Sequence, residues 1–319
     1  MSQGRRAPTF ESVPATAEPD LVIDAHALTK RYDDAVTAVD ALDLRVRRGE
    51  VYGFLGPNGA GKTTTLRMLL GLVRPTAGHA TVLGAAPGAP EGLARIGSMV
   101  EAPAFYPYLS GRDNLRVLAG HAGVGAERVA AVLDQVELRE RAGHRVATYS
   151  LGMKQRLGVA AALLKDPELL ILDETTNGLD PAGMAEMREF LRALGRGERT
   201  VVLSSHLMSE VEQVADRVGV IRDGALVAEG TVEQLRGRPR LRVRAEPIAD
   251  AARLLAGQPG VEGIERTDGV LDIAVDPARA AALNRALVRA GIDVAELSLQ
   301  KASLEDVFLD LTSEAKEPR

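Results

Sequence analysis

Residues 56–65 read GPNGAGKTTT, and they directly follow the apolar, strand-like run VYGFL at residues 51–55. The helix-prone segment TTTLRMLLGL overlaps the end of the stretch and continues it. A strand, a glycine-rich turn and a helix in this order are the context in which G-x-x-x-x-G-K-[ST] forms a phosphate-binding loop. The alternative is a plain glycine turn, but such a turn does not require the lysine and threonine that stand in register here. The stretch therefore predicts an α/β fold that binds a phosphorylated ligand.

Each part of the loop has an expected task. The glycines let the backbone bend so that successive N–H groups point toward an anion, and the helix that starts near Lys62 adds its positive end. Lys62 is expected to reach the β- and γ-phosphates of a nucleotide, and the Thr63 hydroxyl to ligate Mg²⁺. The expected phosphate-binding residues are Gly56, Pro57, Asn58, Gly59, Ala60, Gly61, Lys62, Thr63 and Thr64.

The composition is that of a globular protein, since 45% of the 319 residues are hydrophobic and 26% are charged. No apolar run approaches the ~20 residues of a membrane span, and the first residues lack the apolar core of a signal peptide. The net charge of -5 argues against a nucleic-acid binder, which needs clustered Lys and Arg. The chain has no Cys, and its five His lack the spacing of a zinc site. We therefore expect a cytoplasmic protein that does not bind nucleic acid.

Residues 1–20 contain Pro and small polar residues without periodicity, and we expect them to be a disordered leader. Residues 21–237 form the expected large domain, with extended segments first and then alternating strands and helices. In this domain, residues 112–143 have apolar residues at helical spacing, and a further helix is expected at about 153–164.

The run at residues 169–172 is apolar throughout, which is typical of a parallel strand buried on both faces. Asp173 and Glu174 follow it, at the edge where open α/β sheets place their ligand chemistry. A helix cap is the alternative interpretation of this acidic pair. A second apolar strand, at 200–206, ends at His206.

Residues 238–319 form the expected second domain. Their strand and helix patterns follow the order β-α-β-β-α-β, which is the order of a ferredoxin-like fold. The segment SLEDVFLDLT then predicts a last helix with one apolar face. No anion-binding loop or acidic cluster occurs here, so we expect a regulatory or architectural role.

Five motifs in a fixed order identify a family resemblance: the glycine loop, YSLGMKQR, LLILDE, NGLD and SSH. Together they resemble the ATP-binding cassette (ABC) ATPases that drive membrane transporters, over about residues 21–235. The resemblance implies a P-loop cassette with a mixed sheet core, an antiparallel β subdomain and a helical subdomain. It also implies that the cofactors are ATP and Mg²⁺. The implied roles are adenine stacking for Tyr32, metal binding for Asp173, water activation for Glu174 and γ-phosphate contact for His206.

The motif SLGM at residues 150–153 resembles the family's signature loop, which binds the γ-phosphate of ATP held by the opposite subunit. On this resemblance Ser150 and Gly152 contact that nucleotide, and Asp180 belongs to the loop that runs along the interface. The implied functional unit is a head-to-tail dimer of two copies of this chain. Leu151 and Thr175 depart from the family pattern, where Gly and Pro are usual.

Glu101 is a third departure, because the family usually has Gln at this position. We expect its carboxylate to meet the metal through water. The segment VEAPAFYPYLSGRDNL around it is similar to the subgroup that exports bacitracin and lantibiotics, and SLEDVFLDLT is similar to the end of the daunorubicin-export ATPases. The implied function is drug or peptide-antibiotic efflux through a separate membrane permease, which holds the chain at the cytoplasmic face of the membrane.

Phe105, Tyr106 and Tyr108 concentrate three aromatic residues within four positions, and we expect them to receive the permease. The alternative is that they fill a core. Two other functions stay open at this point. One is a soluble ABC ATPase that acts on the ribosome or another macromolecule. The other is a small-molecule kinase with the same glycine loop.

Overall fold

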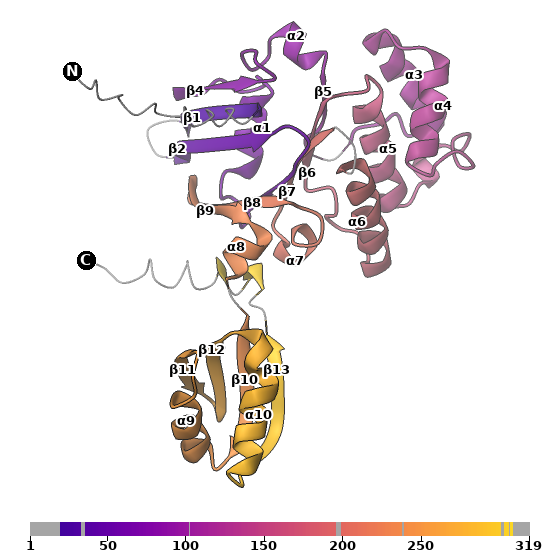
Figure 1. Cartoon of the computed structure of the whole chain (residues 1–319). Helices are drawn as coiled ribbons and strands as arrows, with labels where there is room; N and C mark the ends of the chain where they lie inside the picture. The colour runs from indigo at the N-terminus through magenta and orange to yellow at the C-terminus, as the bar shows by residue number, and fades with distance from the viewer. Residues whose placement is uncertain are drawn as a thin grey trace, which may run out of the picture.

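The computed structural model describes residues 20–32, 36–101, 103–195, 199–237, 239–300, 303–305 and 307–308. A large lobe contains the phosphate-binding loop, and a small lobe follows it in the chain (Figure 1). The expected leader, apart from Asp20, lies outside the described residues, and so does most of the second half of the predicted last helix.

The central sheet of the large lobe has six strands in the order β5-β6-β7-β3-β8-β9. All neighbours are parallel except β8 and β9, so the sheet is mixed, as predicted. Its strands are β3 (Val51–Leu55), β5 (Ile96–Met99), β6 (Leu169–Asp173), β7 (Thr200–Ser205), β8 (Arg217–Arg222) and β9 (Ala225–Thr231). Every residue of β3, β6 and β7 is buried, which explains why these strands lack polar alternation.

Register brings the functional segments to one edge of this sheet. Leu55 pairs with Ser205, and Asp173 pairs with Ser204. The phosphate-binding loop, the acidic pair and His206 therefore all follow the carboxyl ends of adjacent strands.

A second, antiparallel sheet has the order β2-β1-β4. Its strands are β1 (Leu21–Tyr32), β2 (Val36–Arg47) and β4 (Ala77–Val82). Leu42 of this sheet, Phe54 of β3 and Leu66 of helix α1 belong to one hydrophobic core. The helix that begins in the phosphate-binding loop is thus fixed against both sheets.

The remaining elements are mostly helical. The α-helices are α1 (Lys62–Leu69), α2 (Pro90–Leu93), α3 (Gly111–Ala122), α4 (Ala126–Gln135), α5 (Leu151–Leu163), α6 (Pro181–Gly195), α7 (Met208–Val211), α8 (Val232–Arg236), α9 (Ile248–Ala256) and α10 (Ala280–Arg289). Two 3₁₀ turns span Val146–Thr148 and Pro277–Arg279. The helical region predicted at 112–143 is two helices, because Gly123 ends α3 at a φ of 69°. Helix α5 begins two residues earlier than predicted, since Ser150 caps it.

The small lobe has the predicted β-α-β-β-α-β order. Its strands are β10 (Arg240–Glu246), β11 (Val261–Thr267), β12 (Val270–Val275) and β13 (Asp293–Gln300), in the sheet order β11-β12-β10-β13. Helices α9 and α10 pack together on this sheet over a separate hydrophobic core (Figure 1). This arrangement is a small α+β, ferredoxin-like fold.

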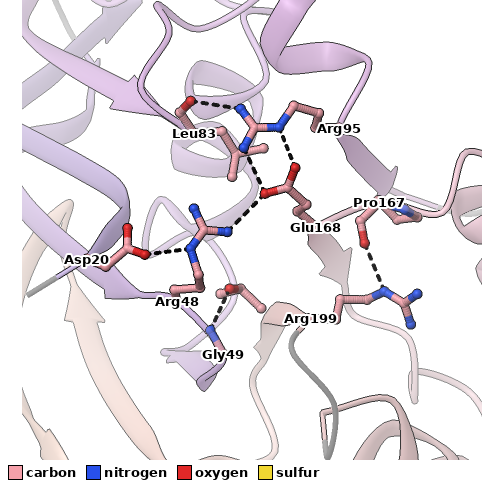
Figure 2. Close-up of polar contacts among 9 residues, drawn as sticks. Asp20, Arg48, Gly49, Leu83, Arg95, Pro167, Glu168 and Arg199 are labelled. Carbon is pink, nitrogen blue, oxygen red and sulfur yellow. Dashed lines mark hydrogen bonds and ion pairs between the residues drawn. The ribbon is translucent and has the colours of Figure 1, made fainter.

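A polar network joins the two sheets of the large lobe at the edge opposite the phosphate-binding loop (Figure 2). Glu168 lies just before β6, and its carboxylate accepts hydrogen bonds from Arg95 Nη2 at 2.7 Å and Arg48 Nη1 at 2.9 Å. Arg48 also donates from Nε to Asp20 at 2.6 Å, at the start of β1. The Arg95 guanidinium, with help from Arg48, holds the pKa of Glu168 at about 2.

Candidate active site

The phosphate-binding loop has the backbone that the glycine pattern predicts. Gly61 has a φ of 106°, and a Cβ there would lie 2.4 Å from the Ala38 carbonyl oxygen. Only glycine fits this position, because both the conformation and the space exclude a side chain. Helix α1 begins at the next residue, and no side chain caps its first turn. The free N–H groups of this turn therefore face the loop and can bind an anion.

Lys62 lies inside the loop, and its side chain is only 5% exposed. Its ammonium group donates to the carbonyl oxygens of Gly56 at 2.7 Å and Pro57 at 3.1 Å. The third neighbour is Glu174 Oε1, at 3.3 Å. A lysine has three N–H donors, so these three acceptors match its capacity. The ammonium is thus positioned between the loop and the acidic pair.

Asp173 is buried at the end of β6, and its two oxygens have different partners. The Thr63 hydroxyl donates to Oδ2 at 2.8 Å, and the Ser204 hydroxyl donates to Oδ1. Thr63 lies in α1 and Asp173 at the end of β6, and metal binding by both residues stays a prediction. Both contribute hard oxygen atoms, the ligand type that Mg²⁺ prefers.

These residues fit a Mg²⁺ ion that is shared with phosphate. Among the described residues there is no group of three or more His, Cys, Asp or Glu that could hold a metal. The protein therefore offers one hydroxyl and one carboxylate here, and phosphate oxygens and waters must complete an octahedral shell.

Ser204 is a polar residue of the candidate site that the motif analysis missed. Its buried hydroxyl donates to Asp173 and accepts from the backbone N–H of Glu174 at 3.3 Å. The signal in the sequence is weak, because Ser204 is simply the first serine of SSH. Only the pairing of β6 with β7 shows that it lies beside the acidic pair.

Glu174 and His206 form a pair next to Lys62. His206 Nδ1 lies 2.7 Å from Glu174 Oε2. An ionised carboxylate only accepts hydrogen bonds, so Nδ1 carries the proton and Nε2 faces away from Glu174. Glu174 has a φ of 51°, a left-handed conformation that is costly for a residue with a side chain. The Glu174 carboxylate contacts the side chains of Lys62 and His206. These contacts favour a role in the candidate site over the alternative that Glu174 caps a helix.

The signature residues lie around a separate hollow. Ser150 accepts a hydrogen bond from Met153 N at 3.3 Å and caps α5. A hollow of about 360 Å³ lies there, and its lining includes Ser150, Gly152 and Asp180. Asp180 also accepts from Gly183 N at 2.9 Å, at the start of α6. The described lining contains no residue of the phosphate-binding loop, so this hollow is separate from the loop within one chain.

Tyr32 and Glu101 each have a local partner. Lys30 Nζ lies 5.0 Å from the centre of the Tyr32 ring. The Glu101 carboxylate forms an ion pair with Arg67 of α1, and its backbone is left-handed, with a φ of 67°. Adenine stacking by Tyr32 and metal contact by Glu101 therefore stay predictions, and Arg67 would compete with a metal for the Glu101 carboxylate.

The three aromatic residues divide into two groups. Phe105 is half-buried and packs on the main core, as the core alternative proposed. Tyr106 and Tyr108 are 51% and 66% exposed, with ring centroids 5.8 Å apart. A groove of about 640 Å³ begins at Glu101 and Phe105 and continues along α3 and the end of α5.

Comparison with known proteins agrees with this geometry. Residues 39–177 match the ABC transporter family, and residues 230–312 match the family described as ATP-binding protein DrrA1-3-like, C-terminal domain. The chain is 42% identical over 297 residues to the bacitracin transport ATP-binding protein BcrA of Bacillus licheniformis, covering 91% of this chain and 97% of that protein. The chain belongs to the ATP-binding proteins of ABC transporters.

Other ABC proteins extend the similarity. The chain is 38% identical over 317 residues to the daunorubicin/doxorubicin resistance ATP-binding protein DrrA of Streptomyces peucetius, covering 95% of this chain and 96% of that one. A solved structure of the ATP-binding subunit of an ABC transporter superposes with a TM-score of 0.60 at 27% identity, over 67% of this chain and 92% of that chain. This ABC protein therefore binds and hydrolyses ATP on a P-loop cassette fold. Within the described residues, no helix has the length and apolarity needed to cross a membrane.

Proposed function

We propose that this chain powers the export of a peptide antibiotic or related drug, as a head-to-tail dimer attached to a separate membrane permease. The observation that carries the proposal is the division of the site. Lys62, Asp173 and Glu174 form one half, while Ser150 and Gly152 line a hollow elsewhere on the same chain. A second copy could supply the missing half to each nucleotide.

The exposed surface at the signature half-site supports this dimer. Leu151 is a large apolar residue at the first turn of α5, and it is exposed. Ser150, next to it, is exposed as well. Exposed apolar residues beside polar ones are typical of surfaces that bind a partner.

The proposed chemistry assigns a task to each side chain of the catalytic half. Lys62 would exchange the Gly56 and Pro57 carbonyls for phosphate oxygens, and neutralise their charge. Glu174, released from Lys62, would accept a proton from the attacking water. His206 would keep the carboxylate oriented through Nδ1 and approach the γ-phosphate with Nε2. Thr63 and Asp173 would hold Mg²⁺, which supplies charge neutralisation when it is bound.

The permease is proposed to bind the groove beside Glu101, which Phe105 lines, and to contact Tyr106 and Tyr108, which follow Phe105 in the chain. The groove joins the segment after β5 to α3 and α5, so an occupant would contact both the central sheet and the helical region. Two exposed aromatic rings are strong contact residues. This location would place the chain at the cytoplasmic face of the membrane.

The permease contact is tested by co-purification. We expect the double variant Tyr106→Ala, Tyr108→Ala to bind ATP normally and to lose its polytopic membrane partner. Val36→Ala, at another exposed apolar residue, is the matched control. Undiminished co-purification of the double variant would exclude this surface as the permease contact.

The names of the relatives support export of a toxic compound, since they are transport or resistance proteins. They do not favour a soluble ABC ATPase that acts on the ribosome. Bacitracin is the first substrate to test. A host that carries the chain and its permease should resist bacitracin, and Glu174→Gln should abolish the resistance. If the host that carries both proteins is as sensitive to bacitracin as the host without them, bacitracin is excluded as the substrate. Daunorubicin would then be the next compound to test.

A further inference from the structure

The end of the described chain returns from the small lobe to the large one. Leu304 follows β13 by four residues, yet it is only 1% exposed and belongs to the core of the large lobe together with Met208 and Val211. Phe308 packs against the same core. Figure 1 shows this yellow segment beside α8, between the large lobe and the small lobe. Residues 303–305 and 307–308 thus form a docking segment, bound to the cassette within the same chain.

Glu212 is the residue at which this docking segment meets the cassette. Its carboxylate accepts from the backbone N–H of Leu304 at 2.5 Å. It also accepts two hydrogen bonds from Arg236, at 3.0 Å from Nε and 2.7 Å from Nη2. The Glu212 side chain is buried, so these bonds are shielded from water.

This arrangement connects both ends of the small lobe to one carboxylate. Arg236 is the last residue of α8, and β10 of the small lobe begins four residues later. Leu304 is the point at which the chain comes back. Any displacement of the small lobe therefore acts on Glu212 from two directions.

A short path leads from Glu212 to the catalytic half-site. Helix α7 begins two residues after His206, and Glu212 N bonds to the Met208 carbonyl oxygen at 3.0 Å, at the end of the same turn. We name residues 207–212 the switch segment. This segment is tied to α6 by the ion pair of Arg188 and Glu210, at 2.8 Å. His206 is thus held at the amino end of a segment whose carboxyl end carries the docking segment.

We propose that binding of the docking segment to the cassette fixes the switch segment, and that Glu212 is a positioning residue for His206. This inference rests on the proposed role of His206 at the γ-phosphate. Undocking frees the switch segment and loosens the contact between His206 and Glu174. Undocking should therefore lower kcat. The KM for ATP should stay unchanged, because the contacts described above do not involve residues of the phosphate-binding loop.

The experiment needs a signal for docking that is independent of activity. The chain has no Trp, so Phe308→Trp introduces a single fluorescent reporter at the docked surface of the full chain. In this background Leu304→Asp places a charge in the core contact and should release the segment. Leu299→Asp is the matched control, because Leu299 belongs to the same lobe and is 48% exposed.

We expect Leu304→Asp to shift the Trp emission to longer wavelength and to lower kcat by about 10-fold, with KM changed less than about 2-fold. Leu299→Asp should change neither. A red shift without a fall in kcat would overturn the coupling, and an unshifted emission would overturn the docking.

A second variant tests the proposal independently, in case the Leu304→Asp protein does not fold. Glu212→Gln keeps the shape of the side chain but removes its charge, and Glu233→Gln, at an exposed residue of α8, is its control. We expect the same selective loss of kcat from Glu212→Gln, and an unchanged kcat would refute its positioning role. His206→Ala separates the two proposals. If the His206→Ala protein hydrolyses ATP at the wild-type rate, the proposed role of His206 is wrong. The Trp emission of the Leu304→Asp protein still shows whether the segment is docked.

Discussion

Replacing Glu168 by Gln tests the polar network at the edge opposite the active site. The carboxylate receives guanidinium hydrogen bonds from Arg95 and Arg48, and through Arg48 it is linked to Asp20 at the start of the antiparallel sheet (Figure 2). Glu168→Gln keeps the size of the side chain but removes its charge. The network would then lose the charged acceptor that both arginines share.

The magnitude follows from the pKa of Glu168, which the arginines lower from 4.5 to about 2. A difference of this size corresponds to at most about 3.4 kcal/mol of folding free energy. The Glu168 side chain is 41% exposed, so solvent screening reduces the expected loss to about 1 kcal/mol. For a domain of this size, the melting temperature should fall by about 2–4 °C.

Thermal unfolding of the wild type and of Glu168→Gln at several pH values measures this loss. A lowered folded-state pKa stabilises the fold above the unfolded pKa, so the difference should be complete at pH 7. It should shrink as the pH falls below about 4.5 toward 2. Glu140→Gln, at an exposed loop residue, controls for loss of a charge. Equal melting temperatures at pH 7, or a difference that grows on acidification, would refute the reasoning.

Two further predictions concern the active site. Lys62→Ala should raise the Kd of ATP by about 10-fold to 150-fold, because it removes a charge-assisted contact of about 1.5 to 3 kcal/mol; isothermal titration with ATP measures this, and an unchanged Kd would exclude a phosphate contact. Ser204→Ala should raise the Mg²⁺ concentration for half-maximal ATPase activity by about 10-fold, since Asp173 loses the donor that orients it. Ser204→Thr retains the hydroxyl and should restore the Mg²⁺ dependence, and an identical Mg²⁺ titration for Ser204→Ala would show that Ser204 orients nothing.

The sequence predicted the elements that have strong local patterns. GPNGAGKTTT after an apolar strand predicted the loop, because glycine conformations and the lysine are local requirements. The apolar run at 169–172 predicted a strand buried on both faces, and residues after 237 predicted the β-α-β-β-α-β order. These predictions are confirmed.

Features that depend on distant contacts were not predictable in this way. Ser204 becomes important only when β7 pairs with β6, and the burial of Leu304 depends on a core formed by residues about a hundred positions earlier. Phe105 is half-buried and packs against the core while Tyr106 is exposed, a difference that their shared aromatic character does not encode. The sequence predicted a helical region at 112–143 but not the position where α3 ends. Gly123 ends this helix because it adopts a left-handed conformation, which its presence in the sequence alone does not show.

The central claim is that Glu174 activates water in a site completed by a second copy of this chain. The most direct test is light scattering of purified Glu174→Gln protein with and without Mg-ATP. The proposed site predicts that ATP binds, is not hydrolysed and holds the protein as a dimer, whereas the protein alone is a monomer. A monomer with ATP bound, or hydrolysis at the wild-type rate, would contradict it.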